Sequence, residues 1–307
     1  MVRARTQRGG FSPGVAARLE LADGRRVFLK AVSAEVNPDS PGLYRREARV
    51  AAALPAKAPA PALLWMDEEG PWVALAFEEV DGRPPRLPWR RAELTRVLDA
   101  LHRSSRDLTP SPLALPSFAR AHQALFGHWD ARGRAVGASG PAPFGPWVRG
   151  RARDLARLEP GWRRASAGRS LLHCDLREDN VLLTSRRVFF VDWPWACQGA
   201  PWIDLLLFLP SVAMQGGPPP WELFDPHPLA EEASPAKVDA LLVALAGFFL
   251  FRGAAPPPPG LPLVRRFQWE QGRQVVRWLR YRWEGVDAEN GGVPAFAFRP
   301  SGPSASP

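Results

Sequence analysis

The chain is poor in cysteine, and this shortage argues against both a disulfide framework and a metal cluster. It has 307 residues but only two cysteines, Cys174 and Cys197, and no segment typical of a secreted protein, so we expect reduced thiols. Neither cysteine belongs to a CxxC pair. His173 and Asp175 flank Cys174, but adjacent residues of an extended chain point in opposite directions and rarely bind one ion. We therefore expect no zinc site on these cysteines.

The chain also lacks an apolar run long enough to cross a membrane and a segment typical of a signal peptide. Residues 1–10 are polar and basic, and no apolar stretch with a small-residue cleavage site follows them. The most apolar stretch, residues 240–251, is well short of the roughly 20 residues that a bilayer requires, and a buried helix explains it better. We expect a folded cytoplasmic protein with no membrane partner, disordered only in its tail, residues 296–307.

Lysine is scarce although the chain is basic. Of 40 Lys and Arg residues only Lys30, Lys57 and Lys237 are lysine, and the formal net charge is +9. The arginines are spread along the chain with acids among them, without a continuous basic arm or an aromatic-plus-basic RNA signature. We therefore expect no nucleic-acid partner, and nucleic-acid binding is the weaker of two rival functions. A lysine within a strand-like run of so arginine-rich a chain needs a chemical explanation.

The N-terminal part of the chain predicts a small antiparallel sheet with one helix packed on it. Residues 15–32 read as a hairpin with an Asp-Gly turn, and the glycine-rich connection before it, residues 9–14, has a backbone that can approach a ligand closely. A helix is expected over residues 43–54, where a proline follows. Two further strands are expected at residues 62–66 and 71–80, with a turn at residues 67–70.

A turn-rich joint, residues 81–85, separates this part from one of different character. We expect a hinge there, between an N-terminal lobe of residues 1–80 and a C-terminal lobe of residues 86–295. The second lobe is expected to be mainly helical to about residue 284, with helices at residues 91–108 and 145–158. The predicted fold class is thus α+β, with a small sheet lobe and a larger helical lobe.

The segment LLHCDLREDNVLLTSRRVFFVDW contains the residues with the clearest chemical purpose. His173, Asp175 and Asn180 form an HxDxxxxN pattern, and Asp192 ends the second strand of a hairpin-like run. Phosphoryl transfer needs an aspartate to receive the proton of an acceptor hydroxyl, and it needs hard oxygen ligands for Mg²⁺ beside the phosphates. Protein kinases place these groups in this order. The alternative is that Asp and Asn only form turns and that His173 is a buried histidine bonded to backbone.

Two residues of the N-terminal half complete the pattern. Lys30 lies on the strand that follows the glycine-rich connection, where a lysine would reach nucleotide phosphates, and Glu47 lies on the next helix, where it would hold Lys30 by an ion pair. Taken alone, Glu47 is as well explained by a surface residue that pairs with an arginine. The order of loop, lysine, glutamate, joint, HxDxxxxN and aspartate is what favours the functional interpretation.

These motifs resemble those of the aminoglycoside phosphotransferase family, which includes choline and homoserine kinase relatives. The motifs that carry the resemblance are GGFSPGVAARLEL at 9–21, VFLK at 27–30, REAR at 46–49, HCDLREDN at 173–180, VDWPWA at 191–196 and GAPWIDL at 199–205. The resemblance covers most of the chain to about residue 285. It implies a two-lobed protein-kinase-like fold and a phosphotransferase that moves the γ-phosphoryl of ATP or GTP to a small-molecule hydroxyl with Mg²⁺.

The resemblance also assigns roles to residues. It implies Asp175 as catalytic base, with His173 beside it in the catalytic set, and a structural role for Asp204. It implies Mg²⁺ binding by Asn180 and Asp192. The residues implied for the nucleotide are those of the glycine-rich loop, the ion pair and the interlobe backbone, namely Gly9, Gly10, Ser12, Gly14, Lys30, Glu47, Phe77, Glu78, Glu79 and Val80.

The chain departs from the family pattern at three points. Cys174 stands where the family usually has glycine, Ala200 stands where it often has aspartate, and the phosphate loop lacks a full GxGxxG. A catalytically silent nucleotide-binding scaffold is therefore the main alternative to a kinase. The acids after residue 220 are dispersed, so the sequence does not favour a polycationic acceptor. The acceptor, the choice of ATP or GTP, and monomer or homodimer stay open.

Overall fold

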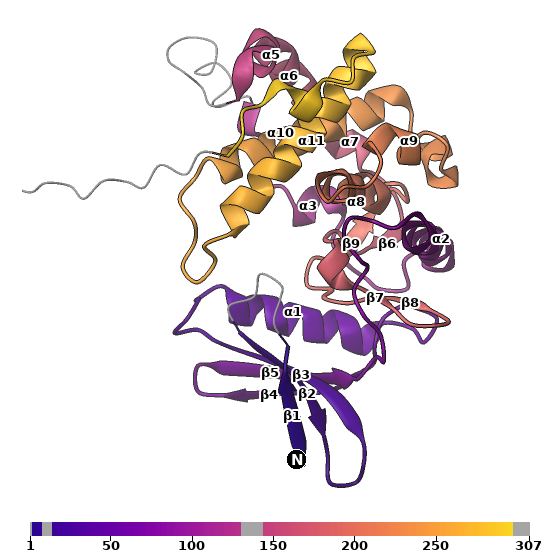
Figure 1. Cartoon of the computed structure of the whole chain (residues 1–307), viewed down its shortest axis with the longest axis vertical. Helices are drawn as coiled ribbons and strands as arrows, with labels where there is room; N and C mark the ends of the chain where they lie inside the picture. The colour runs from indigo at the N-terminus through magenta and orange to yellow at the C-terminus, as the bar shows by residue number, and fades with distance from the viewer. Residues whose placement is uncertain (1, 8–13, 130–143, 297–307) are drawn as a thin grey trace, which may run out of the picture.

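The computed structural model describes residues 2–7, 14–129 and 144–296. Gly9, Gly10 and Ser12 of the predicted phosphate loop lie outside the described residues, as does the predicted tail except for its first residue. Figure 1 shows the arrangement, with a strand-rich N-terminal part below a larger helical part.

The N-terminal part is a five-stranded sheet with the order β1-β2-β3-β5-β4, in which every neighbouring pair is antiparallel. The predicted hairpin is confirmed as β2 and β3, and Lys30 of β3 lies opposite Ala16 of β2. The edge strand β1 was not predicted because its four residues are all exposed and show no apolar alternation. The strands are β1 (Arg3–Thr6), β2 (Val15–Glu20), β3 (Arg26–Ser33), β4 (Leu63–Glu69) and β5 (Trp72–Glu78).

The turn predicted at residues 67–70 is wrong. Strand β4 continues to Glu69, and the reversal takes place at Gly70, which has a positive φ of 54°, and Pro71. The acidic residues that suggested a turn instead form the exposed end of the strand, where Glu68 pairs with Arg45 at 2.7 Å. A charged, exposed edge of this kind does not show the apolar alternation from which strands are recognised.

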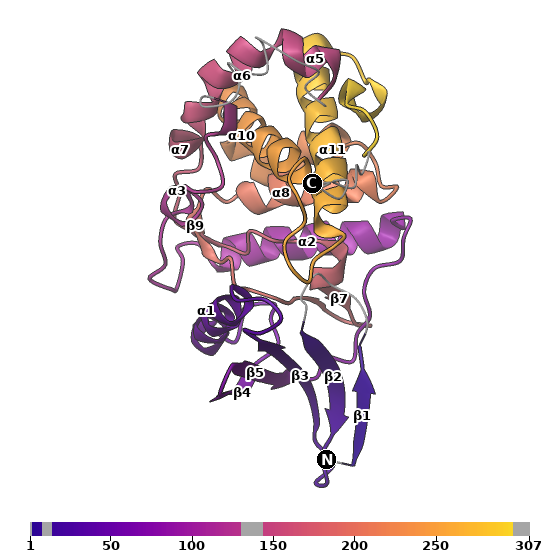
Figure 2. The same cartoon turned by 90° about the vertical axis from the view of Figure 1, so that its left-hand side faces the viewer.

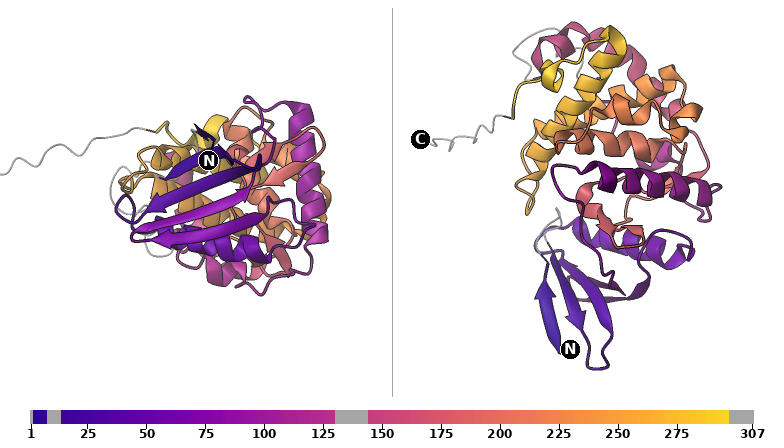
Figure 3. Two further views of the ribbon diagram at one scale, coloured as in Figure 1. Left: turned by 90° about the horizontal axis from the view of Figure 1, so that it is seen from below. Right: turned by 45° about the vertical axis from the view of Figure 1, so that its right-hand side comes forward.

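Helix α1 (Ser40–Ala53) covers one face of the sheet and places Glu47 against it. The helix begins before the predicted residue 43, with Pro41 in its first turn, where proline needs no hydrogen-bond partner. Tyr44, Ala48 and Val73 belong to a buried apolar cluster between the helix and the sheet. Burying a side chain the size of Val73 contributes about 1.5–3 kcal/mol. Helix α1 and the sheet thus form one layer pair, seen from below in Figure 3.

Two short pairs of strands connect the sheet to the helical part. Strands β7 (Val181–Leu183) and β8 (Val188–Phe190) form the predicted hairpin after the HxDxxxxN segment. Strand β6 (Ser170–Leu172) precedes that segment and pairs with β9 (Cys197–Gly199), which was not predicted. Arg83 in the joint exchanges two backbone hydrogen bonds with Leu183, at 2.7 and 3.1 Å. The joint is therefore tied directly to the strand that follows the motif.

The helical part is built around two long antiparallel helices, α10 and α11. Figure 2 shows them side by side, with α2 crossing between them and the sheet. The buried helix predicted at residues 240–251 is confirmed as the centre of α10. A Cβ on Gly253 of α10 would lie 2.9 Å from the Trp269 backbone, so only glycine allows this close approach. The main helices are α2 (Arg91–Asp107), α8 (Ile203–Met214), α10 (Pro235–Gly253) and α11 (Val264–Glu284).

Shorter helices complete the helical part. The helix predicted over residues 145–158 is broken at Arg151 into α5 and α6, so that prediction is correct in type and wrong in continuity. In the described part of the chain, no helix is long and apolar enough to span a membrane. The shorter helices are α3 (Phe118–Ala121), α5 (Gly145–Gly150), α6 (Ala152–Leu158), α7 (Trp162–Ala165) and α9 (Pro220–Phe224), with 3₁₀ turns η1 (Glu159–Gly161), η2 (Glu178–Asn180), η3 (Pro228–Glu232) and η4 (Glu289–Gly292).

Candidate active site

The loop between β6 and η2 is fixed by a buried carboxylate and a buried histidine. The backbone N–H groups of His173 and Cys174 donate to the two oxygens of Asp204, at 2.7 and 2.8 Å. The His173 ring Nε2 lies 2.9 Å from the carbonyl of Val191, the residue before Asp192. Burial lowers the pKa of His173 to about 4, so its ring is neutral near pH 7. His173 and Asp204 therefore hold the loop in place, and neither is suited to accept a proton from a substrate.

Cys174 occupies a backbone conformation that favours glycine, with a φ of 66°. This geometry turns the chain sharply between the buried His173 and the more exposed Asp175. Burial raises the pKa of the Cys174 thiol well above its ordinary value, so the side chain is a protonated thiol. Cys174 therefore keeps the backbone conformation of the family's usual glycine, and the hydrogen bond from its N–H to Asp204 holds it there.

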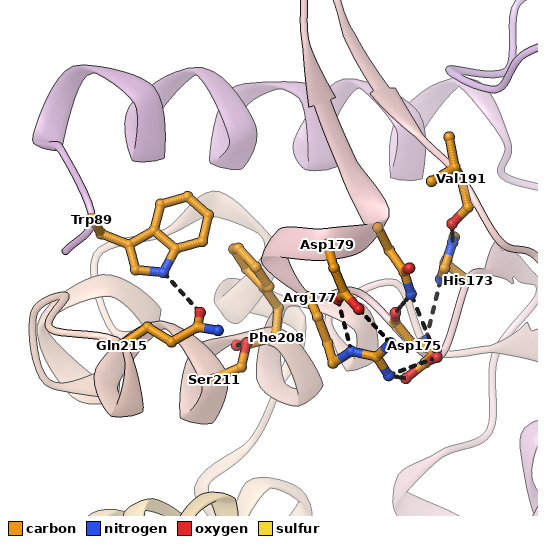
Figure 4. Close-up of polar contacts among 10 residues, drawn as sticks. Trp89, His173, Asp175, Arg177, Asp179, Val191, Phe208, Ser211 and Gln215 are labelled. Atoms are coloured by element: carbon orange, nitrogen blue, oxygen red, sulfur yellow. Dashed lines mark hydrogen bonds and ion pairs between the residues drawn. The ribbon is translucent and has the colours of Figure 1, made fainter. Parts of the chain in front are cut away.

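Arg177 is a central residue of the site that the sequence reasoning missed. Its guanidinium contacts both oxygens of Asp175, at 2.8 and 3.0 Å, and both oxygens of Asp179, at 2.9 and 3.1 Å (Figure 4). The signal was present, because Arg177 has an acid two positions before it, Asp175, and another two positions after it, Asp179. The three side chains form one charged cluster on the loop.

Asp175 is poised to titrate near neutral pH. Burial raises its pKa to about 7, against the positive charge of Arg177, which acts to lower it. Asn180 fixes the same residue from the other side, because its side-chain nitrogen donates to the Asp175 carbonyl at 2.7 Å. That bond makes the Asn180 side-chain oxygen the atom suited to bind a cation.

The structure brings Lys30, Glu47 and Asp192 together, although 162 positions separate Lys30 from Asp192. The Lys30 ammonium forms ion pairs with Glu47 and, at 2.8 Å, with Asp192. Burial acts to lower the pKa of Lys30, but the charges of Asp192 and Glu47 outweigh it and raise the pKa. Burial raises the pKa of Glu47 to about 8. Burial acts in the same direction on Asp192, but the charge of Lys30 outweighs it, and the pKa of Asp192 is lowered.

A cavity of about 300 Å³ lies over these groups, between the sheet and the loop. Its walls combine the N-terminal sheet and the residues after it with the hairpin of β7 and β8. Among its lining residues are the described members of the predicted nucleotide and metal sets, Gly14, Lys30, Glu47, Phe77, Glu78, Glu79, Val80, Asn180 and Asp192. The Glu79 side chain is held by Arg18 and Arg26, at 3.0 and 2.7 Å.

A second cavity of about 520 Å³ adjoins the first on the helical side. Asp175 lines only this second cavity, whereas Lys30 and Asn180 line only the first. Arg177 and Asp192 line both. Asp175 thus faces a different space from Lys30 and Asn180, and the two spaces meet at Tyr44, Glu47, Arg177 and Asp192.

The donor atoms at the first cavity suit a hard cation. Asn180 offers an amide oxygen and Asp192 a carboxylate, and Mg²⁺ is bound in proteins by one or two such ligands together with substrate phosphates. The left-handed φ of 70° at Asp192 directs the chain out of the hairpin at this point. The residues present therefore fit Mg²⁺.

The fold of the chain is that of kinase-like phosphotransferases. Residues 8–225 match the model of the phosphotransferase enzyme family, and the chain belongs to that family. The resemblance seen in the sequence is thereby confirmed. Family and fold are those of small-molecule phosphotransferases. A search of curated proteins finds no match.

Solved structures share the fold at low sequence identity. A thermostable mutant of the aminoglycoside phosphotransferase APH(4)-Ia, in ternary complex with AMP-PNP and hygromycin B, has a TM-score of 0.59 and 16% identity over 93% of this chain and 95% of that one. A choline/ethanolamine kinase family protein from Mesorhizobium loti has a TM-score of 0.55 and 17% identity over 94% and 90%. An aminoglycoside phosphotransferase from Alicyclobacillus acidocaldarius has a TM-score of 0.55 and 15% identity over 92% and 93%. The two-lobed, α+β fold expected from the sequence is thus confirmed.

Proposed function

We propose that the protein is a small-molecule kinase that transfers the γ-phosphoryl group of ATP or GTP to a hydroxyl of its acceptor. The observation that carries the proposal is the pair of adjoining cavities, with Lys30 and Asn180 on one side, Asp175 on the other, and Arg177 and Asp192 between them. This division matches the two substrates of a phosphoryl transfer. The nucleotide occupies the first cavity, against the backbone of residues 77–80, and the acceptor occupies the second.

Each residue has one task in the transfer. Asp175 accepts the proton of the acceptor hydroxyl while the acceptor oxygen bonds to phosphorus and the bond to the leaving nucleoside diphosphate breaks. Lys30, oriented by Glu47, contacts the nucleotide phosphates in place of its present bond to Asp192. Arg177 faces both substrates and offsets the negative charge of the transferred group. Asn180 and Asp192 would hold Mg²⁺, which neutralises phosphate charge when bound.

The walls of the second cavity favour an acceptor with an apolar body and no excess of positive charge. Phe118, Phe126, Phe248 and Phe267 line it together with several leucines. Arg252 and Arg265 line it as well, and burial together with Arg252 lowers the pKa of Arg265, as expected where two cations lie close together. This pair repels cationic groups at the end of the cavity formed by α10 and α11, whereas the acids that line it, Asp39, Glu47, Asp175 and Asp192, belong to the N-terminal part and the loop. We therefore propose a neutral or anionic hydroxyl compound as acceptor.

Thermal unfolding with ATP and with GTP, each with and without Mg²⁺, tests the nucleotide site. A nucleotide at a hundred times its Kd stabilises the folded state by about 2.7 kcal/mol. We expect a rise in melting temperature that needs Mg²⁺ and that is lost in Asp192→Asn. Equal stabilisation of Asp192→Asn and the wild type would contradict the assignment of this cavity.

The acceptor class is tested by turnover with hydroxyl compounds of different charge. We expect neutral or anionic compounds with an apolar body to stimulate Mg²⁺-nucleotide turnover, and hygromycin B, which a structural neighbour binds, to have no effect. Arg252→Glu should reverse part of this preference. Stimulation by hygromycin B alone would overturn the proposed acceptor class and leave the nucleotide assignment intact.

A further inference from the structure

A cluster of soft ligand atoms lies beside the catalytic loop, although the sequence predicted none. The thiols of Cys174 and Cys197 are 3.3 Å apart, and the Cys197 sulfur lies 3.9 Å from Nε2 of His122. The three ligand atoms all lie within 4.8 Å of one another. The sequence argument considered only the neighbours of Cys174, whereas the fold brings its partners from the end of α3 and from β9.

We propose that Cys174, Cys197 and His122 form a binding site for a thiophilic divalent ion, with Zn²⁺ as its natural class. In a tetrahedral zinc site with Zn–S bonds of about 2.3 Å and Zn–N bonds of about 2.0 Å, the ligand atoms are separated by about 3.5–3.8 Å. The separations of 3.3 Å between the two sulfurs and 3.9 Å between Cys197 and His122 lie on either side of this range, and the third pair, Cys174 and His122, lies within 4.8 Å. To accept the ion, the thiols move apart by about half an ångström, and His122 and Cys174 approach each other by no more than about 1.3 Å.

The surroundings of the cluster suit a cation with two thiolates. Binding breaks two S–H bonds, releases two protons to solvent and forms two sulfur–metal bonds, so two thiolates neutralise the divalent ion. Asp175 and Asp204 lie close enough to Cys174 to affect its charge, whereas Arg46 faces His122. His122 is almost fully buried and, among the described residues, its Nδ1 has no hydrogen-bond partner. The ring nitrogen that lies near the Cys197 sulfur is Nε2, so a neutral imidazole is already directed at that thiol.

The position of the site gives it one open side. Cys197 is fully buried, but Cys174 and His122 both line the second cavity. Three protein ligands leave the fourth position of a tetrahedral ion to that cavity, next to Asp175. If the cavity holds the acceptor, as the proposed function has it, bound Zn²⁺ hinders acceptor binding without displacing nucleotide. Ion binding itself does not depend on that function.

Cobalt titration of the reduced protein tests the site directly, because thiolate bound to Co²⁺ gives an intense charge-transfer absorption. We expect one equivalent of Co²⁺ to produce this absorption and Zn²⁺ to displace it. Cys197→Ser and Cys174→Gly should each abolish it, and the second variant leaves β9 unchanged. His122→Gln should weaken Co²⁺ binding at least about tenfold. Asp192→Asn, a matched control in the Mg²⁺ cavity, should keep the absorption.

The outcomes separate the site from its alternatives. Absence of the absorption from the reduced wild type, or its persistence in Cys197→Ser, would overturn the proposal. The proposal would also be overturned if the reduced protein bound no metal and its two thiols only formed a disulfide with each other on air oxidation. If Co²⁺ binds but Mg²⁺-nucleotide does not stabilise the protein, the metal site stands and the kinase proposal fails.

Discussion

Lys30→Met removes the cation that lies between the carboxylates of Glu47 and Asp192, and its effect can be worked out from the burial of Glu47. The Glu47 side chain is 4% exposed and the Asp192 side chain is 37% exposed. Asp192 can therefore be hydrated when Lys30 is lost, whereas Glu47 cannot. Breaking a buried ion pair by removing one partner costs about 3–5 kcal/mol. We expect a loss at the lower end of this range, because Glu47 can take up a proton.

The same substitution makes stability depend on pH in a defined direction. Burial already raises the pKa of Glu47 from its ordinary value of 4.5 to about 8, and removing Lys30 removes the charge that opposes this rise. A carboxyl with a higher pKa in the folded state takes up a proton on folding, so its stabilising effect is complete below pH 4.5 and is lost as the pH rises toward the folded pKa. The deficit of Lys30→Met relative to the wild type should therefore stay constant from about pH 5 to about pH 8 and widen above about pH 8, where Glu47 loses its proton in the wild type and keeps it in the variant.

Thermal unfolding of Lys30→Met, Lys30→Met/Glu47→Gln and Lys57→Met below and above about pH 8 checks the reasoning. The double variant replaces the buried acid by a neutral amide and should recover most of the lost stability without recovering nucleotide binding. Lys57 is exposed, so Lys57→Met should unfold like the wild type at every pH. A deficit that does not change with pH, or a double variant as unstable as the single one, would refute the assignment of the cost to Glu47.

Three further predictions concern the loop. Asp175→Asn should lower the rate of phosphoryl transfer by at least about a hundredfold and leave the stabilisation by nucleotide intact. Asp192→Asn should instead weaken the binding of Mg²⁺-nucleotide. Equal losses of nucleotide binding in both variants would contradict this division of roles. Transfer measured as kcat/KM should rise with pH through about 7 and then level off, because Asp175 must lose its proton to act as base, and a flat profile would exclude it. Cys174→Gly should be about 1 kcal/mol more stable than Cys174→Ala in thermal unfolding, because a positive φ of 66° is unfavourable for a residue with a Cβ. The reverse order of stability would show that the loop is unstrained.

Much of the framework could be predicted because it rests on local patterns. The hairpin that carries Lys30 has period-two alternation and an Asp-Gly turn, and the loop that carries Asp175 and Asn180 has fixed spacing. The pairing of Lys30 with Glu47 followed from their order along the chain. The contact of Lys30 with Asp192 was beyond such reasoning, because it depends on how two distant parts of the chain meet.

The features that were missed depend on solvent exposure or on distant contacts. Strand β1 and the end of β4 are exposed and charged, so no apolar periodicity marks them. The clamp of Arg177 on Asp175 was visible as alternating charge but was not interpreted. The cluster of His122, Cys174 and Cys197 joins three segments whose proximity no local pattern encodes.

Turnover of Mg²⁺-nucleotide by the wild type and by Asp175→Asn, measured side by side with their thermal stabilisation by the same nucleotide, tests the central claim most directly. The kinase proposal predicts that both proteins are stabilised equally and that only the wild type releases nucleoside diphosphate, faster when an acceptor is present. Stabilisation of both proteins with no turnover by either, across a panel of neutral and anionic hydroxyl compounds, would contradict it and identify a nucleotide-binding scaffold instead.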